Sequence, residues 1–264
     1  GGKGANQAVA AKRSEAVTNF IGAIGNDEAG EMMRELLSEE GIELAGVQTL
    51  EKQATGQAYI IVDDQGENSI MIHSGANNAF TPKQVQAHTD LIKASDFIVA
   101  QFESTLESTV EAFTIAREAG VKTILNPAPA LENVPEELLK VTDMIIPNET
   151  ETEILTGIKV TDEASLKAAA DHLHQLGIEA VIITIGSKGA FYDVQGRSGI
   201  VPAFKVNAVD TTAAGDTFIG AMSSILAKDF SNLEQAIEYG NKASSLTVQR
   251  FGAQPSIPYK NELK

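Results

Sequence analysis

The sequence predicts a three-layer α/β domain with a central, mostly parallel sheet. Apolar β-rich runs alternate with stretches of helical period along most of the 264 residues, which is the pattern of strand–helix–strand units. Runs such as Val181-Ile182-Ile183 are apolar on both faces, as strands are when helices cover both sides of a parallel sheet. No proline- or serine-rich linker or internal repeat interrupts the pattern, so we expect a single domain over residues 1–264.

Each element is expected from its own run of residues. Strands are predicted at residues 17–22, 57–62, 69–73, 96–101, 121–126, 144–147, 180–186 and 204–209, with a further β-like run at 190–194. Helices are predicted at residues 5–13, 28–40, 82–93, 106–119, 149–156, 163–176, 214–227 and 233–249. Gly41, Gly120 and Gly177 each follow a helical run where a left-handed C-cap belongs, and Ser104-x-x-Glu107 has the pattern of a capping box.

The runs 57–62 and 69–73 differ from the rest of the chain. They are joined through Asp63-Asp64-Gln65-Gly66, which indicates a hairpin with no helix between its strands. We therefore expect a small sheet beside the main one at residues 57–73.

The composition argues against several classes of protein. The chain has 20 basic and 36 acidic residues, and this formal charge of −16 repels nucleic-acid phosphates, so we expect no nucleic-acid partner. The absence of cysteine removes disulfides, thiolate nucleophiles and zinc–sulfur sites. No apolar run approaches the roughly 18 residues of a membrane span, and no secretory signal is visible. A cytoplasmic protein without a membrane partner is expected.

The segment 209–218 carries the strongest chemical signal, and it joins a predicted strand to a helix of small residues. Ala213, Ala214 and Gly215 would expose the backbone N–H groups of the first helical turn, where the helix dipole places about half a positive charge. These amides predict an anion hole. Asp216 belongs to the same turn, where it is either a simple N-terminal helix acid or a base that deprotonates a hydroxyl attacking phosphorus. The surrounding residues favour the base.

Two glycine-containing segments are open to a functional or a structural interpretation. Gly1-Gly2-Lys3-Gly4-Ala5-Asn6 is either a polyol-binding loop, with Lys3 and Asn6 as donors, or a turn before a helix. It is not a Walker A loop, because no Ser or Thr follows the lysine. Thr184-Ile185-Gly186-Ser187-Lys188-Gly189 follows a buried strand, where α/β sheets commonly place ligands, or is an ordinary turn.

Several acidic and histidine residues are ambiguous by themselves. Asn148-Glu149-Thr150-Glu151 is fully explained as a capping box, although Glu151 near a hydrated Mg²⁺ is the alternative. Glu103, after the strand at 96–101, either accepts hydrogen bonds from sugar hydroxyls or is solvated. His172 and His174 are two residues apart on a helix and point away from each other, so no histidine metal site is expected.

Together, these segments resemble the PfkB-type carbohydrate kinase family over essentially the whole chain. The segment 210–216, Asp-Thr-Thr-Ala-Ala-Gly-Asp, is specific to that family. The first ten residues, Asn126-Pro127-Ala128-Pro129-Ala130, and the segments 148–151 and 252–256 are similar to its ribose-phosphorylating members.

The resemblance implies ATP-dependent phosphorylation of D-ribose at its 5-hydroxyl. It also implies a small β lid, here residues 57–73, that forms a homodimer interface. By position, Asp216 resembles the catalytic base, and the amides of Ala213, Ala214, Gly215 and Asp216 resemble the anion hole. The other matching positions are Gly2, Lys3, Gly4, Ala5, Asn6 and Glu103 for the sugar; Asn148, Thr184, Ile185, Gly186, Ser187, Lys188, Gly189, Gly215 and Asn241 for ATP; Asp210, Thr212, Thr247, Arg250, Gly252 and Ser256 for an activating K⁺ or similar monovalent cation; and Glu151 for Mg²⁺, through water.

The beginning of the sequence departs from the family pattern. Family members normally begin with a strand that carries an Asn and an Asp for the sugar, followed by two further lid strands, and Gly1 is preceded by neither. We therefore expect the lid to be partly absent. Two alternatives stay open: a kinase for another small sugar such as deoxyribose, and a non-catalytic nucleotide-binding fragment.

Overall fold

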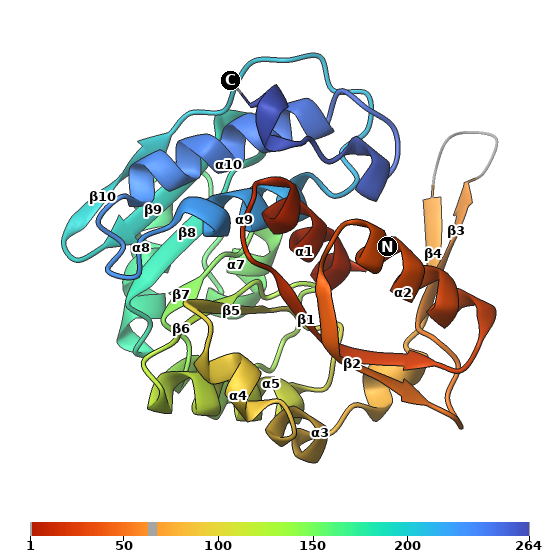
Figure 1. Cartoon of the computed structure of the whole chain (residues 1–264). Coiled ribbons are helices and arrows are strands. Elements are labelled where there is room, and N and C mark those ends of the chain that lie inside the picture. Colours follow the sequence, from red (N-terminus) through yellow and green to blue (C-terminus); the bar gives the residue numbers. More distant parts are fainter. Residues whose placement is uncertain (1, 63–67, 264) are drawn as a thin grey trace.

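A mixed β-sheet forms the middle layer of the protein (Figure 1). The structure, a computed structural model, describes residues 2–62 and 68–263, and within them this sheet has six strands in the order β10-β9-β8-β7-β6-β5. The parallel strands are β5 (Phe97–Ala100), β6 (Lys122–Leu125), β7 (Met144–Ile145) and β8 (Ala180–Thr184), and β9 (Ala190–Val194) and β10 (Arg197–Val201) continue the sheet antiparallel. The predicted three-layer α/β class is confirmed.

Helices cover both faces of this sheet (Figure 1). The helices are α1 (Lys3–Arg13), α2 (Glu28–Glu39), α3 (Pro82–Gln86), α4 (Thr89–Lys93), α5 (Leu106–Glu118), α6 (Glu136–Lys140), α7 (Glu149–Thr156), α8 (Glu163–Gln175), α9 (Ala214–Ile225) and α10 (Leu233–Thr247). Apolar residues of α9 and α10 pack on one face, and those of α5, α6 and α8 pack on the other.

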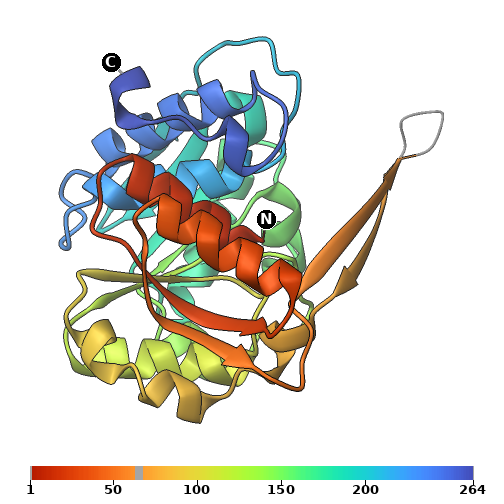
Figure 2. The ribbon, with the colours of Figure 1, turned by 45° about the vertical axis from the view of Figure 1, so that its right-hand side comes forward.

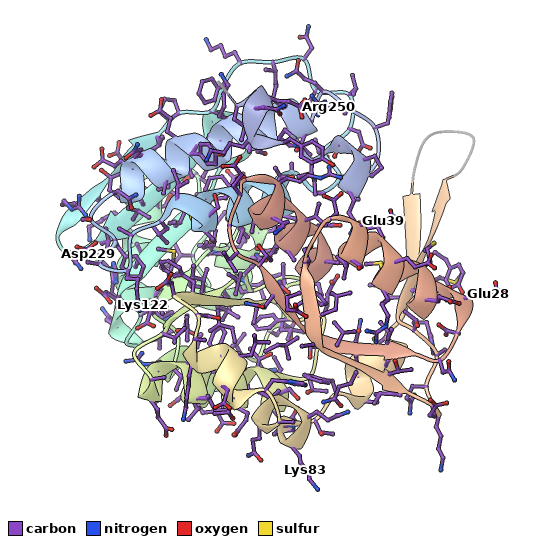
Figure 3. The ribbon with its side chains drawn as sticks, in the orientation of Figure 1. Glu28, Glu39, Lys83, Lys122, Asp229 and Arg250 are labelled. Atoms are coloured by element: carbon purple, nitrogen blue, oxygen red, sulfur yellow. The ribbon has the colours of Figure 1, made fainter. Side chains whose placement is uncertain are left out.

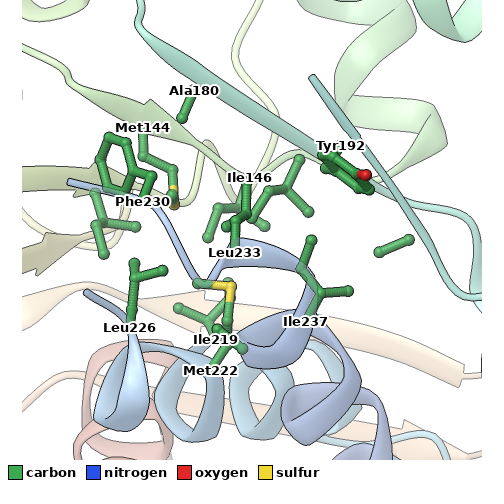
Figure 4. Packing of buried hydrophobic residues seen from close by; sticks show 14 of the residues in the cluster. Met144, Ile146, Ala180, Tyr192, Ile219, Met222, Leu226, Phe230, Leu233 and Ile237 are labelled. Carbon is green, nitrogen blue, oxygen red and sulfur yellow. The ribbon is translucent and has the colours of Figure 1, made fainter. Parts of the chain in front are cut away.

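The two faces are built by alternate residues of the same strands. Ile182 of β8 packs with α9 and α10, whereas its neighbours Val181 and Ile183 pack with α5, α6 and α8. Figure 4 shows the first of these clusters, in which Met144 and Ile146 face Met222 and Leu233. Burial on both faces explains why these strands lack a polar side, as the sequence pattern indicated.

A second, two-stranded parallel sheet lies beside the first. It consists of β1 (Asn19–Gly25) and β2 (Glu43–Leu50), and within the described residues it shares no ladder with the six-stranded sheet. An open cavity of about 1330 Å³ has residues 20–24 of β1 and residues 97–100 of β5 in its lining.

An antiparallel hairpin projects from the body of the protein (Figure 2). Its strands β3 (Gln57–Val62) and β4 (Asn68–His73) pair from Gln57 with His73 to Val62 with Asn68. The hairpin expected at residues 57–73 is therefore present, while its expected turn at residues 63–66 lies outside the described residues.

Most predicted helix ends are confirmed. Gly41, Gly120 and Gly177 have φ values of 75°, 73° and 97°, the left-handed conformation that a residue without Cβ adopts without strain. The capping box expected at Ser104 is wrong by one residue. Thr105 is the N-cap of α5, and its hydroxyl oxygen accepts from the amide of Ser108.

Two other segments differ from the prediction, one through a long-range hydrogen bond and one through a local one. The strand expected at 204–209 is wrong: this segment pairs with no strand among the described residues, and the amide of Val209 donates to the carbonyl of Val248 instead. The helix expected at 82–93 is two short helices. The hydroxyl of Thr89 donates to the carbonyl of Gln86, an oxygen that would accept from a backbone amide in a continuous helix. The prediction also missed β2, α6 and β10, which are short or half-exposed elements.

The charged side chains of Glu28, Glu39 and Lys83 lie at the periphery (Figure 3), whereas Asp143, Glu151, Asp193 and Asp216 are buried. None of the helices in the described parts of the chain is long and apolar enough to cross a membrane.

Gly220 lets α9 lie against α1. A Cβ at position 220 would lie 2.3 Å from the carbonyl oxygen of Gln7 and 2.6 Å from the Cβ of Ala10. We expect Gly220→Ala to lower the free energy of unfolding by roughly 1–3 kcal/mol, the usual penalty of overpacking. Urea unfolding measures this loss.

Gly215→Ala is the matched control for stability on the same helix. A Cβ there meets nothing within 4 Å, and alanine favours a helix, so stability should be unchanged or higher. Equal free energies of unfolding for the two variants would contradict the close-packing account.

Candidate active site

The N-terminus of α9 begins with a backbone turn that is unusual for its residue type. Ala213, the N-cap, has φ 60° and ψ 13°, a left-handed conformation that is strained for a residue with a Cβ. The amide of Ala214 donates to the carbonyl of Thr211 at 3.2 Å. The amides of Gly215 and Asp216 follow in the first helical turn, where an α-helix leaves N–H groups without intrahelical partners.

Side chains of α1 hold the carboxylate of Asp216. Asn6 Nδ2 donates to Asp216 Oδ2 at 2.9 Å, and Gln7 Nε2 donates to Asp216 Oδ1 at 3.0 Å. All three residues are buried. The close approach of α1 and α9 at Gly220 brings these groups together, so the carboxylate is held by two neutral amides from another helix.

The N-terminus of α1 also meets the end of β5. The backbone amide of Lys3 donates to Glu103 Oε2 at 2.6 Å, and Gly2 stands before it with φ 86°. A Cβ at Gly4 would lie 3.0 Å from Gln101 Oε1, so a small residue is needed there. The predicted sugar-binding positions Gly2, Lys3 and Glu103 thus lie together, although they are far apart in the chain.

A cavity of about 210 Å³ joins several of the separate sequence motifs. Its lining includes Lys3, Asn126, Asn148, Glu151, Thr184, Thr211, Ala213, Ala214, Gly215 and Asp216. The carboxyl ends of β6, β7 and β8 and the N-termini of α7 and α9 therefore open into one space, as is usual at the ligand edge of an α/β sheet.

Asn148 and Glu151 form the capping box that the sequence indicated. The backbone amide of Glu151 donates to Asn148 Oδ1 at 2.8 Å, and the backbone amide of Asn148 donates to Glu151 Oε2 at 2.9 Å. Burial raises the pKa of Glu151 above its ordinary value of 4.5, and the nearby charge of Asp216 acts in the same direction; the Asn148 amide and Lys3 oppose this rise. The cap explains the fold of the turn, and the same carboxylate lines the cavity.

The predicted nucleotide loop at 184–189 follows β8, and the predicted nucleotide residue Asn241 lies on α10. The amide of Thr184 donates to the carbonyl of Pro147, and a Cβ at Gly189 would lie 2.1 Å from the carbonyl oxygen of Val201. Asn241 Nδ2 donates to the carbonyls of Val201 and Pro202 at 3.1 and 3.2 Å. Asn241 therefore holds the chain after β10 against the loop at 184–189.

Three of the predicted monovalent-cation residues, Asp210, Thr212 and Gly252, meet at the carboxylate of Asp210. Asp210 Oδ1 accepts from the amide and hydroxyl of Thr212, and Asp210 Oδ2 accepts from the amide of Gly252 at 2.8 Å. These hydrogen bonds lower the pKa of Asp210, with that from the Thr212 hydroxyl the largest. The segment before α9 is thereby tied to the segment after α10.

Three other predicted cation positions have structural partners. Thr247 Oγ1 donates to Thr217 Oγ1 at 3.1 Å, Ser256 Oγ donates to the carbonyl of Ala253, and Arg250 pairs with Glu262. Across residues 2–62 and 68–263, no group of three His, Cys, Asp or Glu side chains converges as metal ligands do. Backbone carbonyls are the remaining donors for a monovalent cation in these loops.

Sequence reasoning missed the amide side chains around Asp216. Gln7 donates to both Asp216 and Asn126, and Gln101 donates to Gln7. Gln7 and Asn126 lie inside segments that the sequence singled out, but a glutamine or asparagine side chain carries no signal of its partners until the fold brings them together.

The family described as pfkB family carbohydrate kinase matches residues 1–260. The chain belongs to this family. It is 48% identical to the ribokinase of Staphylococcus aureus (strain COL), covering all of this chain and 86% of that protein. It is 51% identical to the bifunctional ribokinase/ribose-5-phosphate isomerase A of Fructilactobacillus sanfranciscensis, where it spans 48% of the longer protein. The resemblance predicted from the motifs is confirmed.

Solved structures of pfkB-type kinases have the same fold. The structure of Arabidopsis thaliana ribokinase complexed with ribose and ATP superimposes with a TM-score of 0.95, at 31% identity, over all of this chain and 86% of that one. The ribokinase of Thermotoga maritima superimposes with a TM-score of 0.89 at 36% identity. As a member of the pfkB family, the chain is a phosphotransferase whose acceptor is a sugar hydroxyl.

Glu151→Gln should remove the buried charge and keep the helix cap, since glutamine retains an oxygen that accepts from the Asn148 amide. The raised pKa of Glu151 means that the folded state binds this proton more tightly than the unfolded state, so ionisation costs stability as the pH rises through and above 4.5. The free energy of unfolding of the variant, relative to wild type, should be higher in neutral than in mildly acidic buffer.

Glu149→Gln, one residue into the same helix and exposed, is the control. Urea unfolding of both variants at the two pH values makes the comparison. The same pH trend in both variants would contradict a specific effect of burial at Glu151.

Proposed function

We propose that this chain transfers the γ-phosphoryl group of ATP to the 5-hydroxyl of D-ribose, with Asp216 as the general base. The observation that carries the proposal is the carboxylate of Asp216, which two amides of α1 hold at the N-terminus of α9 on the wall of the 210 Å³ cavity. The ribokinase names of relatives at 45–51% identity support ribose as the acceptor.

In the proposed reaction, Asp216 acts on the acceptor hydroxyl. Its carboxylate accepts the proton of the 5-hydroxyl while that oxygen forms a bond to the γ-phosphorus. The bond from the γ-phosphorus to the oxygen bridging the β-phosphorus breaks, and ADP leaves with that electron pair. Phosphoryl transfer needs mainly positioning and charge stabilisation from a protein, so one oriented base and an anion site are sufficient machinery.

The phosphate site in this proposal is the first turn of α9. The amides of Gly215 and Asp216 would donate to the transferred group, and the helix dipole adds to their effect. Ala213 and Ala214 shape the turn that presents those amides. Lys3 lines the same cavity and supplies a positive charge beside the phosphates.

The sugar site in this proposal is the meeting point of α1 and β5. Gly2, Gly4 and Ala5 allow close approach to the backbone, and Glu103 accepts from sugar hydroxyls. Asn6 Oδ1 is buried and has no hydrogen-bond partner within the described parts of the chain. An acceptor left in this state favours a ligand hydroxyl as its partner.

The nucleotide in this proposal extends from the cavity along the ends of β8 and β10. Asn148 and the loop at 184–189 (Thr184, Ile185, Gly186, Ser187, Lys188 and Gly189) would contact it, and Asn241 fixes the chain beside that loop. Glu151 fits a hydrated Mg²⁺, because Mg²⁺ in kinase sites uses one or two carboxylates together with the phosphates. The ion would supply charge neutralisation on those phosphates.

A K⁺ site in this proposal lies in the loops tied together by Asp210. Carbonyl oxygens near Thr212, Thr247, Arg250, Gly252 and Ser256 would hold the cation, which would supply positive charge to carbonyl-rich loops adjoining the anion site. The low pKa of Asp210 supports a fixed negative charge in these loops at neutral pH.

The hairpin β3–β4 is proposed as the lid and as the contact between two copies in a homodimer. Tyr59, Met71 and Ile72 on its described part are 53%, 57% and 67% exposed, which is high for large apolar side chains. A covering surface, either a ligand or a second chain, would remove this apolar area from water.

Deoxyribose is the second candidate acceptor. The chain is 35% identical to the deoxyribokinase of Salmonella typhi and covers 84% of that protein. Turnover with deoxyribose exceeding turnover with ribose under equal conditions would favour this candidate.

Asp216→Asn removes the base while keeping the size of the side chain. Ribose-dependent release of ADP should fall by about 10²–10⁴-fold, the usual contribution of general-base catalysis, because an amide cannot take the proton. The affinity for ATP, measured by calorimetry, should stay close to that of wild type. Near wild-type turnover would remove Asp216 from the mechanism.

Replacing KCl by choline chloride at equal ionic strength should lower turnover several-fold, because choline is too large for carbonyl oxygens to surround. Asp210→Asn should weaken this dependence, since it removes the charge that ties the two loops together. Steady-state rates in the two salts provide the measurement. Equal rates of the wild-type protein in both salts would contradict a K⁺ site.

A further inference from the structure

A row of three buried or partly buried carboxamides leads to Oδ1 of Asp216, whereas Asn6 donates to Oδ2. Gln101 Nε2 donates to Gln7 Oε1 at 2.5 Å, and Gln7 Nε2 donates to both Asp216 Oδ1 and Asn126 Oδ1 at 3.0 Å. Asn126 Nδ2 donates in turn to the carbonyl of Ile146 at 3.1 Å. These residues come from the end of β5, from α1 and from the segment after β6.

The donor and acceptor ends of these amides fit in one direction. A carboxamide has a donor end and an acceptor end, and reversing it exchanges the two. Gln101 supplies a donor to the oxygen of Gln7, which leaves the nitrogen of Gln7 facing Asp216. Because Asn126 uses its nitrogen on a backbone carbonyl, its oxygen faces Gln7. Both neighbours therefore require the same orientation of the Gln7 amide.

We propose that Gln7, oriented by Gln101 and Asn126, is a positioning residue that sets the direction of the Asp216 carboxylate for proton transfer. This inference rests on the proposed role of Asp216 as the base. With Asn6 on Oδ2 and Gln7 on Oδ1, rotation of the carboxylate breaks at least one hydrogen bond. A fixed carboxylate presents its remaining lone pairs to the acceptor hydroxyl in one direction.

The neutrality of this row suits a base. An arginine or lysine in place of Gln7 would hold the carboxylate equally firmly, but its charge would make the carboxylate a weaker base. The charged side chains that line the cavity with Asp216 are Lys3 of α1 and Glu151 of α7. Neither takes part in the row, so the row can be changed while both charges remain.

Gln101→Glu tests the proposal at a residue that makes no hydrogen bond to Asp216. A glutamate carboxylate can only accept, so the Gln7 amide must reverse and turn its oxygen toward Asp216 Oδ1. We expect kcat to fall roughly ten- to hundredfold, the equivalent of one hydrogen bond to a charged group. The KM for ATP should stay within about twofold, because the hydrogen bonds of Gln101 and Gln7 described above go to the row and to Asp216 rather than to the loop at 184–189.

The pH profile supplies a second readout that a purely structural role would not change. A carboxylate that loses a donor binds its proton more tightly, so the acidic limb of kcat/KM should move to higher pH in Gln7→Met, which removes the donor without adding a charge. Gln101→Met removes the donor without reversing Gln7 and should have a smaller effect on both quantities. Gln175→Glu, the same change at an exposed position on α8, controls for the added charge and should match wild type.

Equal losses of kcat in Gln101→Glu and Gln101→Met would overturn the proposal, since the direction of the Gln7 amide would then be irrelevant. An unmoved acidic limb in Gln7→Met would also overturn it. Should Gln101→Glu fail to fold by circular dichroism, the loss of kcat is measured in Gln7→Met, which must show the same ten- to hundredfold fall. Asp216→Asn separates the two claims: if that variant is active, the base assignment fails, and if it is inactive while the row variants match wild type, the positioning proposal alone fails.

Discussion

The backbone of α1 lies against α9 at Gly220, where a side chain would collide with the carbonyl of Gln7. This contact places Asn6 and Gln7 within hydrogen-bond distance of Asp216. The same approach sets Lys3 beside the first turn of α9 in the wall of the 210 Å³ cavity. The site therefore depends on one helix–helix distance, and any change in it moves the sugar side relative to the phosphate side.

The other walls of the site depend on the parallel part of the sheet. Parallel strands end at the same edge, and β6, β7 and β8 bring Asn126, Asn148 and Thr184 there in succession. The capping box of Asn148 and Glu151 has two roles in the structure. It satisfies the orphan amides of α7, and it holds a carboxylate at the cavity despite the desolvation that raises its pKa.

Membership of the pfkB family joins these features to sugar phosphorylation, and the electrostatics of the site are consistent with that chemistry. Asp216 is held by neutral amides, while positive charge and helix amides lie on the phosphate side. A base whose hydrogen-bond donors are neutral retains more of its affinity for a proton than one held by a cation, whereas phosphate oxygens gain from every donor nearby.

The sequence by itself determined the α/β class, most helices and core strands, the left-handed glycine caps and the capping box at Asn148, because each of these depends on local periodicity or on residues within one turn. It also indicated the family through segment 210–216. The tertiary structure alone decided which residues hold Asp216, because an amide side chain has no local signature of its partner. Asn6 and Gln7 donate to the carboxylate, and Gln101 and Asn126, far away in the chain, contact Gln7. The tertiary structure likewise decided that 204–209 is not a strand, because pairing needs a neighbour that sequence does not reveal.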